Sequence, residues 1–222
     1  MDPLRPPAAV IFDLDGTLVD TVPTRIAAWS QAVDERGIPA TAAQLGPLIG
    51  SDGRMLARRV ATDAGATLDD ASIDALDRRH GEIFSELNAD PQPLPGVAAA
   101  LAALDARGIT WAIATSSGRD QVQASVAALD LDHAPAIVDG SHVAHAKPAP
   151  DLLLLAAREL GVPADACWYV GDSTWDMEAA AAAGMVPIAV MAGAAVQREA
   201  LVAAGARAVL DTADELTGLL PG

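Results

Sequence analysis

Residues 8–21 read Ala8-Ala9-Val10-Ile11-Phe12-Asp13-Leu14-Asp15-Gly16-Thr17-Leu18-Val19-Asp20-Thr21. The apolar run at the start has the length of a buried strand, which we expect over residues 8–12. Two carboxylates follow with one leucine between them, and side chains two residues apart on an extended chain point the same way. Crowded carboxylates repel unless a cation or a shared proton relieves them, and open α/β sheets bind ligands outside the carboxyl ends of their strands. Asp13 and Asp15 are therefore candidates for a functional site.

The composition of the 222 residues suits one domain, or a core domain with an insert. The formal net charge of −16 argues against nucleic acid and anionic membranes as partners, and a small phosphorylated substrate would need local cations. Cys167 is the only cysteine, so no disulfide forms within the chain, as is typical of a reducing compartment. No run approaches the roughly 20 apolar residues of a membrane helix, and residues 1–7 do not resemble a signal peptide. We expect a cytoplasmic protein, either a monomer or a homodimer.

Two different periodicities divide the chain. Residues 22–88 contain helical spacing without a convincing strand, with helices expected over 22–33, 41–48, 52–64 and 69–87, the third of them capped by Ser51. A proline-rich connector follows at 88–96 and resembles a hinge. Beyond it, strands are expected at 109–114, 136–138, 167–170, 186–190 and 208–210, and helices at 97–107, 120–129, 150–160, 176–183, 196–203 and 212–220.

Alternating strands and helices predict a parallel sheet with helices on both faces, an α/β fold that also includes the strand at 8–12. The helical block interrupts this pattern after the first strand. We therefore expect a core formed by residues 1–16 and 96–222, and an inserted α-helical cap at 17–95 with hinges at 17–22 and 88–96.

Three further segments carry polar residues next to expected strands or helices. Thr115-Ser116-Ser117-Gly118 follows the strand at 109–114 and offers hydroxyl and N–H donors for a phosphate, although a serine here also suits a helix cap. Lys147 precedes a proline and is the only lysine among fourteen basic residues. Gly171-Asp172-Ser173-Thr174-Trp175-Asp176 follows the strand at 167–170, and its carboxylates suit Mg²⁺, although Asp176 also suits a helix N-terminus.

These four segments, in this order, resemble the signatures of the haloacid dehalogenase-like hydrolases, in the branch of phosphoglycolate phosphatases and β-phosphoglucomutases with a helical cap. The resemblance implies a Rossmann-like, doubly wound core. It implies that Asp13 is the nucleophile and Asp15 the general acid and base, while Thr115 and Lys147 stabilise the transferred phosphoryl group and Ser116 binds it. It also implies that Mg²⁺ is held by the side chains of Asp13 and Asp172, the backbone carbonyl of Asp15, and Asp176 through water.

Two positions in the sequence restrict which reactions of this family remain possible. Asp15 supplies an acid that dehalogenase and phosphonate-cleaving relatives lack, which leaves phosphomonoester hydrolysis or phosphomutation. Related sugar phosphomutases keep a histidine where this chain has Arg25, which weakens the mutase alternative. Arg25 and Arg54 are candidate substrate-binding residues in the cap, with a solvated helix face as the alternative for both. We expect a Mg²⁺-dependent phosphatase of a small phosphomonoester, either phosphoglycolate or a sugar phosphate; the remaining alternatives are a sugar phosphomutase and a catalytically silent binding protein.

Overall fold

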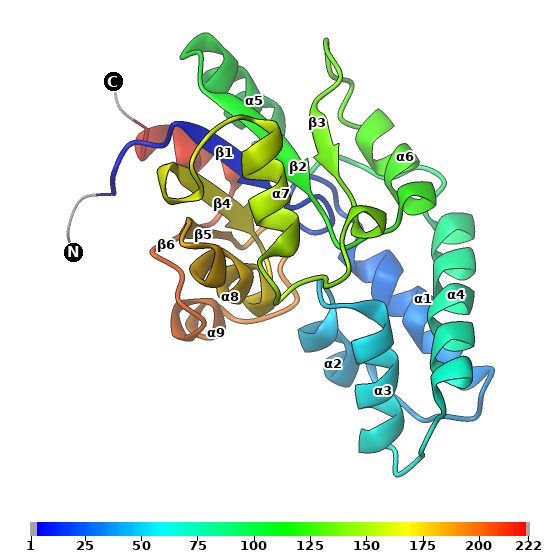
Figure 1. The fold of residues 1–222 in the computed structure, drawn as a ribbon. Coiled ribbons are helices and arrows are strands. Elements are labelled where there is room, and N and C mark those ends of the chain that lie inside the picture. The colour runs from blue at the N-terminus through cyan, green and yellow to red at the C-terminus, as the bar shows by residue number, and fades with distance from the viewer. Residues whose placement is uncertain (1–3, 221–222) are drawn as a thin grey trace.

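The computed structural model describes residues 4–220, and its centre is one six-stranded parallel sheet (Figure 1). The strands lie in the order β3-β2-β1-β4-β5-β6, so the first strand of the chain is inside the sheet. The strand order reverses beside it, because β2 and β3 continue to one side and β4, β5 and β6 to the other. The strands are β1 (Ala9–Phe12), β2 (Thr110–Ala114), β3 (Ala136–Val138), β4 (Cys167–Gly171), β5 (Val186–Val190) and β6 (Ala208–Leu210).

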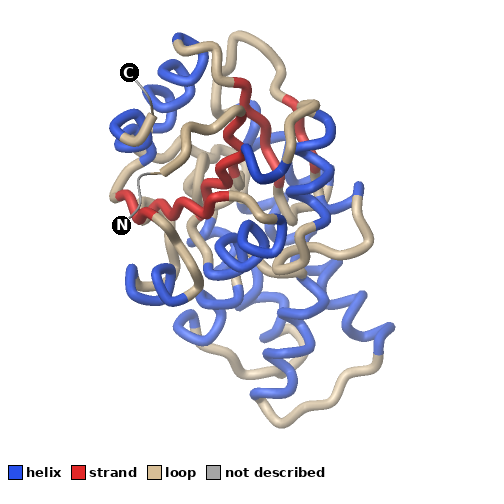
Figure 2. Tube along the Cα trace, turned by 60° about the vertical axis from the view of Figure 1, so that its left-hand side comes forward, coloured by secondary structure: helices blue, strands red, loops and turns tan. Residues whose placement is uncertain are grey.

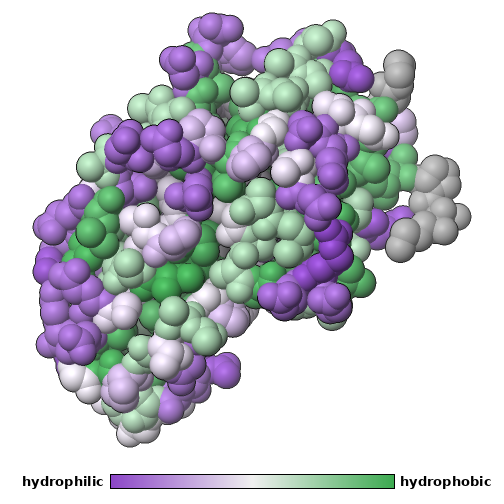
Figure 3. All heavy atoms as spheres, turned by 180° about the vertical axis from the view of Figure 1, so that it is seen from behind, coloured by the Kyte–Doolittle hydropathy of each residue, from purple (hydrophilic) through white to green (hydrophobic). Residues whose placement is uncertain are grey.

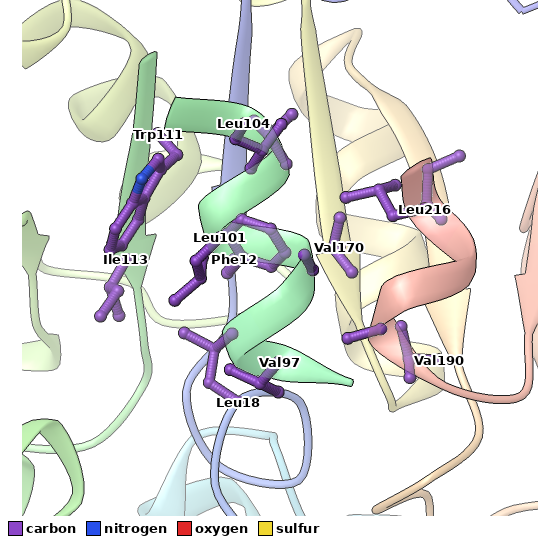
Figure 4. Close-up of a cluster of buried hydrophobic side chains, with 14 of the residues drawn as sticks. Phe12, Leu18, Val97, Leu101, Leu104, Trp111, Ile113, Val170, Val190 and Leu216 are labelled. Atoms are coloured by element: carbon purple, nitrogen blue, oxygen red, sulfur yellow. The ribbon is translucent and has the colours of Figure 1, made fainter. Parts of the chain in front are cut away.

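Helices cover both faces of the sheet, which makes the strands apolar on both sides. On one face, α5 (Val97–Ala106) and the 3₁₀ helix η4 (Ala213–Gly218) pack on a row of strand side chains (Figure 4). Phe12 is in register with Ile113 on one side and Val170 on the other, and all three are at most 1% exposed. Burial of each such side chain contributes on the order of 1.5–3 kcal/mol. This packing fixes the end of β1, where Asp13 begins.

The opposite face is covered by α7 (Asp151–Glu159) and α8 (Thr174–Ala183), which pack on Ile11 and Tyr169. Two further α-helices and two 3₁₀ helices complete the described part of the core. They are α6 (Arg119–Ala127), α9 (Arg198–Ala203) and the 3₁₀ helices η2 (Gly140–His142) and η3 (Ala164–Ala166).

Four helices form a separate body with no strand in its described residues (Figure 2). They are α1 (Val22–Asp34), α2 (Ala42–Leu45) with the 3₁₀ helix η1 (Gly46–Leu48), α3 (Gly53–Asp63) and α4 (Asp70–Leu87). Their buried faces, which include Trp29, Leu56, Ile73 and Phe84, form a hydrophobic cluster of their own. We refer to this helical body as the cap.

The two segments that join the cap to the sheet lie side by side. Leu94 N–H donates to Leu18 O at 3.0 Å, and Asp20 N–H donates to Gln92 O at 2.9 Å. Val19 and Pro93 form an antiparallel bridge between these bonds. Both connections of the cap therefore run through one short two-stranded ribbon.

The outer face of α4 is hydrophilic and lies along one edge of the molecule (Figure 3). Its exposed charged residues recur at every fourth position: Asp70, Asp74, Arg78, Glu82 and Glu86. Its buried residues occupy the opposite face, the pattern of a surface helix. Among residues 4–220, no helix is long and apolar enough to cross a membrane.

The predicted α/β fold is confirmed, while two local predictions and one of the alternatives were wrong. Asp52, not Ser51, caps α3, because the Asp52 carboxylate accepts from Met55 N–H at 2.9 Å while Ser51 Oγ donates to Leu48 O. Neither serine of the 115–118 segment caps α6, whose N-cap is Gly118. The closing helix is a 3₁₀ helix that spans only Ala213–Gly218.

Candidate active site

Three neighbouring strands deliver polar side chains to one edge of the sheet. Asp13 follows β1, Thr115 follows β2 and Asp172 follows β4, and these strands are adjacent in the order β2-β1-β4. The chain is held in place there, since Asp13 N–H donates to Val170 O at 2.8 Å and Thr115 N–H donates to Val138 O at 3.0 Å. All three side chains are at most 4% exposed. The site lies at the reversal of strand order, where α/β sheets bind ligands.

Lys147 reaches this edge from the loop before α7 and is completely buried. Its Nζ donates to Asp13 Oδ1 and to Asp176 Oδ1, both at 2.7 Å, and to the hydroxyl of Tyr169 at 3.1 Å. Burial lowers the pKa of Lys147, but the charges of Asp13 and Asp176 raise it well above its usual value overall. The lysine is therefore a fixed cation beside the Asp13 carboxylate.

Gly16 allows the turn after Asp15 to approach Asp172 closely. Its φ of +81° is one that a side chain disfavours, and a Cβ at this position would lie 2.4 Å from Asp172 Oδ2. The next residue, Thr17, donates its hydroxyl to Asp172 Oδ1 at 2.8 Å. The turn that follows β1 thus orients the carboxylate that follows β4.

Asp176 is held on both of its carboxylate oxygens. Oδ1 accepts from Lys147, and Oδ2 accepts from Ser173 N–H at 2.9 Å and from Ser173 Oγ at 2.6 Å. Tyr169 adds a hydroxyl contact of 3.3 Å to Oδ1. This carboxylate therefore positions Lys147 and the start of α8.

Asp15 points toward the cap, away from the other acids. Its Oδ2 accepts from Arg25 at 2.8 Å and from Ser117 Oγ at 2.5 Å, and its Oδ1 accepts from Thr21 at 2.6 Å. Burial opposes ionisation of Asp15, but Arg25 and the hydrogen bonds from Ser117 and Thr21 lower its pKa below the usual value. Arg25 also donates to Gln121 Oε1 at 3.2 Å. Asp15 is thus held as a carboxylate by a cap residue.

The pKa values of Asp13 and Asp172 are shifted in the opposite direction. Burial, only partly offset by Lys147, raises the pKa of Asp13 to about 7, to which the charges of Asp176 and Asp15 contribute. Burial and the charges of Asp176 and Asp13 raise the pKa of Asp172 well above its usual value. A bound cation would reverse both shifts because it favours the charged form of each acid.

The donor set fits a divalent cation. Asp13, Asp172 and Asp176 each place an oxygen within 4.8 Å of the others, and all three are buried. With Asp15, the site holds four carboxylates against two cations, Lys147 and Arg25, so ionised acids leave a net charge of −2. Mg²⁺ prefers hard oxygen ligands of this kind.

A cavity of about 350 Å³ lies between this edge of the sheet and the cap. Most of the predicted site residues line it, including Asp13, Asp15, Arg25, Thr115, Ser116 and Lys147. Arg54 does not, because it lies at the start of α3 with a half-exposed side chain that pairs with Asp74 at 2.7 Å.

The family model that describes the haloacid dehalogenase-like hydrolases matches the sequence over residues 7–184, which is most of the chain. This chain belongs to that family. The predicted family is therefore confirmed, as are the Rossmann-like fold and an enzyme of the phosphoric monoester hydrolase type.

Similar proteins match between 80% and 95% of the chain. A phosphoglycolate phosphatase of Xanthomonas campestris pv. campestris is 34% identical over 192 residues, which is 86% of each protein. A fructose-1-phosphate phosphatase of Escherichia coli is 34% identical over 182 residues, 80% of this chain and 93% of that protein. The crystal structure of a hydrolase from Pseudomonas syringae superimposes with a TM-score of 0.89 at 34% identity and covers 95% of this chain and 96% of that one.

Several residues of this hydrolase site escaped the sequence analysis. Thr17, Thr21, Ser117 and Tyr169 all contact a predicted site residue. The position of Ser117 in the polar segment after β2 could have indicated a role in the site. Tyr169 gave no such indication, because an aromatic residue in a buried strand reads as core.

The cap wall of the cavity adds Trp29, Asp77 and His80. The rings of Trp29 and His80 stack with centroids 4.1 Å apart. His80 is 4% exposed, and neither of its ring nitrogens has a hydrogen-bond partner among the described residues. An unpaired buried polar group costs about 1–3 kcal/mol. Trp29 thus belongs both to the hydrophobic cluster of the cap and to the cavity wall.

We expect Asp77→Asn to stabilise the hydrolase above pH 6. Burial and the nearby Asp52 raise the pKa of Asp77 from 3.8 to about 6. Between those values the unfolded state binds fewer protons than the folded state, so the free energy of unfolding falls as the pH rises. The amide removes this loss, and the gain at pH 8 should be about 1 kcal/mol, less than the full shift implies because water screens a partly exposed acid.

Urea unfolding of both proteins at pH 4 and pH 8 measures this gain. The exposed Glu86→Gln on the same helix is the control and should change stability by less than about 0.5 kcal/mol at either pH. An equal effect of Asp77→Asn at both pH values would contradict the expectation.

Proposed function

We propose that this hydrolase is a Mg²⁺-dependent phosphatase of small phosphomonoesters and works through an aspartyl-phosphate on Asp13. The observation that carries the proposal is the surroundings of Asp13, a buried carboxylate 2.7 Å from the Lys147 ammonium and grouped with Asp172 and Asp176. A fixed cation beside a carboxylate suits attack on an anionic phosphoryl group, because it offsets the repulsion between them.

In the first half-reaction, a carboxylate oxygen of Asp13 forms a bond to phosphorus as the bond to the ester oxygen breaks. The departing alkoxide takes a proton from the carboxyl group of Asp15 and leaves as the alcohol. Lys147 and the hydroxyl of Thr115 stabilise the charge on the transferred group.

In the second half-reaction, the Asp15 carboxylate removes a proton from water, which attacks phosphorus and frees Asp13 and inorganic phosphate. The contacts of Asp15 support this assignment for the state described here. Arg25, Ser117 and Thr21 all donate to its oxygens, which favours the ionised form that a general base requires.

Mg²⁺ would be held by Asp13 and Asp172, with Asp176 next to them and the Asp15 carbonyl as a further ligand. When bound, it supplies positive charge that stabilises the phosphoryl oxygens. Asp172 is kept in position for this by Thr17 and by the close approach of Gly16.

We further propose that residues 17–95 move as a cap relative to the core of residues 1–16 and 96–222, with hinges at 17–22 and 88–96. The separate hydrophobic cluster of the cap supports this division, as does the two-stranded ribbon through which both connections pass. Opening would admit substrate and closure would exclude bulk water. Arg25 would couple closure of the cap to the active site, because it lies on α1 of the cap and its guanidinium binds Asp15.

Phosphate release from a panel of small phosphomonoesters, with and without Mg²⁺, tests the proposed function. The panel contains phosphoglycolate, several sugar phosphates and p-nitrophenyl phosphate. We expect release to fall at least about a hundredfold when EDTA removes the metal and to recover when Mg²⁺ is restored. Conversion of a hexose 1-phosphate to its 6-isomer without release would instead indicate a mutase. Release that is unaffected by EDTA would contradict the role of the metal.

A further inference from the structure

The two ends of the cavity have different chemistry. The end at the sheet carries the acids and Lys147 described above. The cap end is lined by the stacked rings of Trp29 and His80, by Asp52 and Asp77, and by Ser51. This end faces the alcohol part of the substrate if the phosphoryl group lies at Asp13, so the following inference rests on the proposed function.

The cations that line the cavity are already engaged. Lys147 is bonded to Asp13 and Asp176, and Arg25 to Asp15, Ser117 and Gln121. Arg25 also lies 3.9 Å from the centre of the Phe84 ring, which holds the guanidinium in place. A carboxylate in the alcohol part of a substrate would have to compete with Asp15 for Arg25.

The acids of the cap wall repel a second anion. Asp77 lies against the first residue of α3, since a Cβ at Gly53 would come within 2.0 Å of its Oδ1. Asp52 caps the same helix, so both carboxylates gather at one point of the wall. Carboxylates in a partly buried wall accept hydrogen bonds from hydroxyl groups and disfavour nearby negative charge.

His80 and Trp29 add the features that a neutral polyol would use. Both ring nitrogens of His80 lack a partner among the described residues, although the ring belongs to the wall of the cavity. A neutral imidazole can donate one hydrogen bond and accept another, the combination that a hydroxyl group satisfies. Trp29 lines the same wall with an apolar ring that is stacked on His80.

We propose that the cap wall selects phosphomonoesters whose alcohol part is neutral and polyhydroxylated, as in a sugar phosphate, with Asp77 and His80 as the residues that determine specificity. A substrate whose alcohol part ends in a carboxylate, such as phosphoglycolate, is disfavoured by the same wall.

The test compares kcat/KM for phosphoglycolate with that for a panel of pentose and hexose phosphates. At least one sugar phosphate should exceed phosphoglycolate by about tenfold or more. p-Nitrophenyl phosphate serves as an ester with neither feature. If no ester is hydrolysed, including this one, the proposed function fails; if esters are hydrolysed but phosphoglycolate is preferred to every sugar phosphate, the specificity inference alone is overturned.

Two variants separate a specificity role from a structural one. His80→Phe keeps a ring to stack on Trp29 and should lower kcat/KM for the best sugar phosphate about tenfold, mainly through KM, with partial recovery in His80→Gln. Asp77→Asn should lower kcat/KM for the best sugar phosphate severalfold. The same variant should raise kcat/KM for phosphoglycolate, because the substitution removes a negative charge. His133 is exposed, so His133→Phe is the control and should leave kcat/KM unchanged for both substrates. A proportional loss on both substrates in His80→Phe and Asp77→Asn would overturn the inference.

Discussion

Replacing Asp13 with asparagine is expected to reduce kcat by at least about 10,000-fold while the hydrolase stays folded. An amide nitrogen or oxygen in this position is a far weaker nucleophile than a carboxylate, so no acyl phosphate forms. Stability should not fall, because Lys147 keeps its ion pair with Asp176 and because burial, which raises the pKa of Asp13 to about 7, makes the charged form of Asp13 unfavourable above that pH. Without metal at pH 8, we expect a free energy of unfolding equal to that of the wild type within about 1 kcal/mol, or greater, as when a strained functional residue is removed.

Single-turnover phosphate release and urea unfolding measure the two effects separately. Asp20→Asn is the control, since Asp20 is an exposed acid of the same segment and should keep full activity. Mg²⁺ should also raise the melting temperature of the wild type more than that of Asp13→Asn, because one ligand is lost. Residual turnover of Asp13→Asn within a hundredfold of the wild type would exclude Asp13 as the nucleophile.

The sequence was most informative where function follows from position on a strand. Asp13, Thr115 and Asp172 each come directly after a buried apolar run, and parallel strands bring their carboxyl ends to one edge. The local pattern predicts the strand boundaries, but the adjacency of β2, β1 and β4, which brings the three side chains together, is seen only in the structure. Lys147 has no such pattern, and it was singled out by being the only lysine in the chain and by the family resemblance of its Lys-Pro setting.

Orientation within the cap was harder to predict. Arg25 and Arg54 are both arginines near helix starts, yet Arg25 points into the cavity and Arg54 pairs with Asp74 outside it. Which way each side chain turns depends on how α1, α3 and α4 pack on one another and on the core, and sequence spacing does not contain that information.

The burial of His80, in contrast, can be predicted from the spacing of apolar residues on its helix. His80 lies four residues after Leu76 and four before Phe84, both on the buried face of α4. The periodicity therefore placed a histidine on an apolar face, but only the three-dimensional arrangement brings that face against the cavity and Trp29. The same limit applies to Ser117, whose bond to Asp15 spans 102 residues of sequence.

Replacing Lys147 with methionine is expected to lower both activity and stability, with a stability loss that grows as the pH rises. Methionine has a similar length and fills the buried space, but it leaves the carboxylates of Asp13 and Asp176 without the ammonium 2.7 Å from each. Removing one partner of a buried ion pair costs about 3–5 kcal/mol. Loss of a charge beside the phosphoryl group should lower kcat by about a thousandfold.

The pH dependence follows from the orphaned carboxyl group of Asp13. Burial already raises the pKa of Asp13 above that of the unfolded chain, and loss of the Lys147 charge raises it further. The penalty is therefore absent at low pH, where Asp13 is protonated in both states, and complete above its folded-state pKa. The deficit of Lys147→Met in urea unfolding should therefore be larger at pH 8 than at pH 5. Arg59→Met, which breaks the exposed pair with Asp63, is the matched control and should cost less than about 0.5 kcal/mol at both pH values. A loss of stability in Lys147→Met that does not change with pH would mean that it comes from lost packing and not from uncompensated charge.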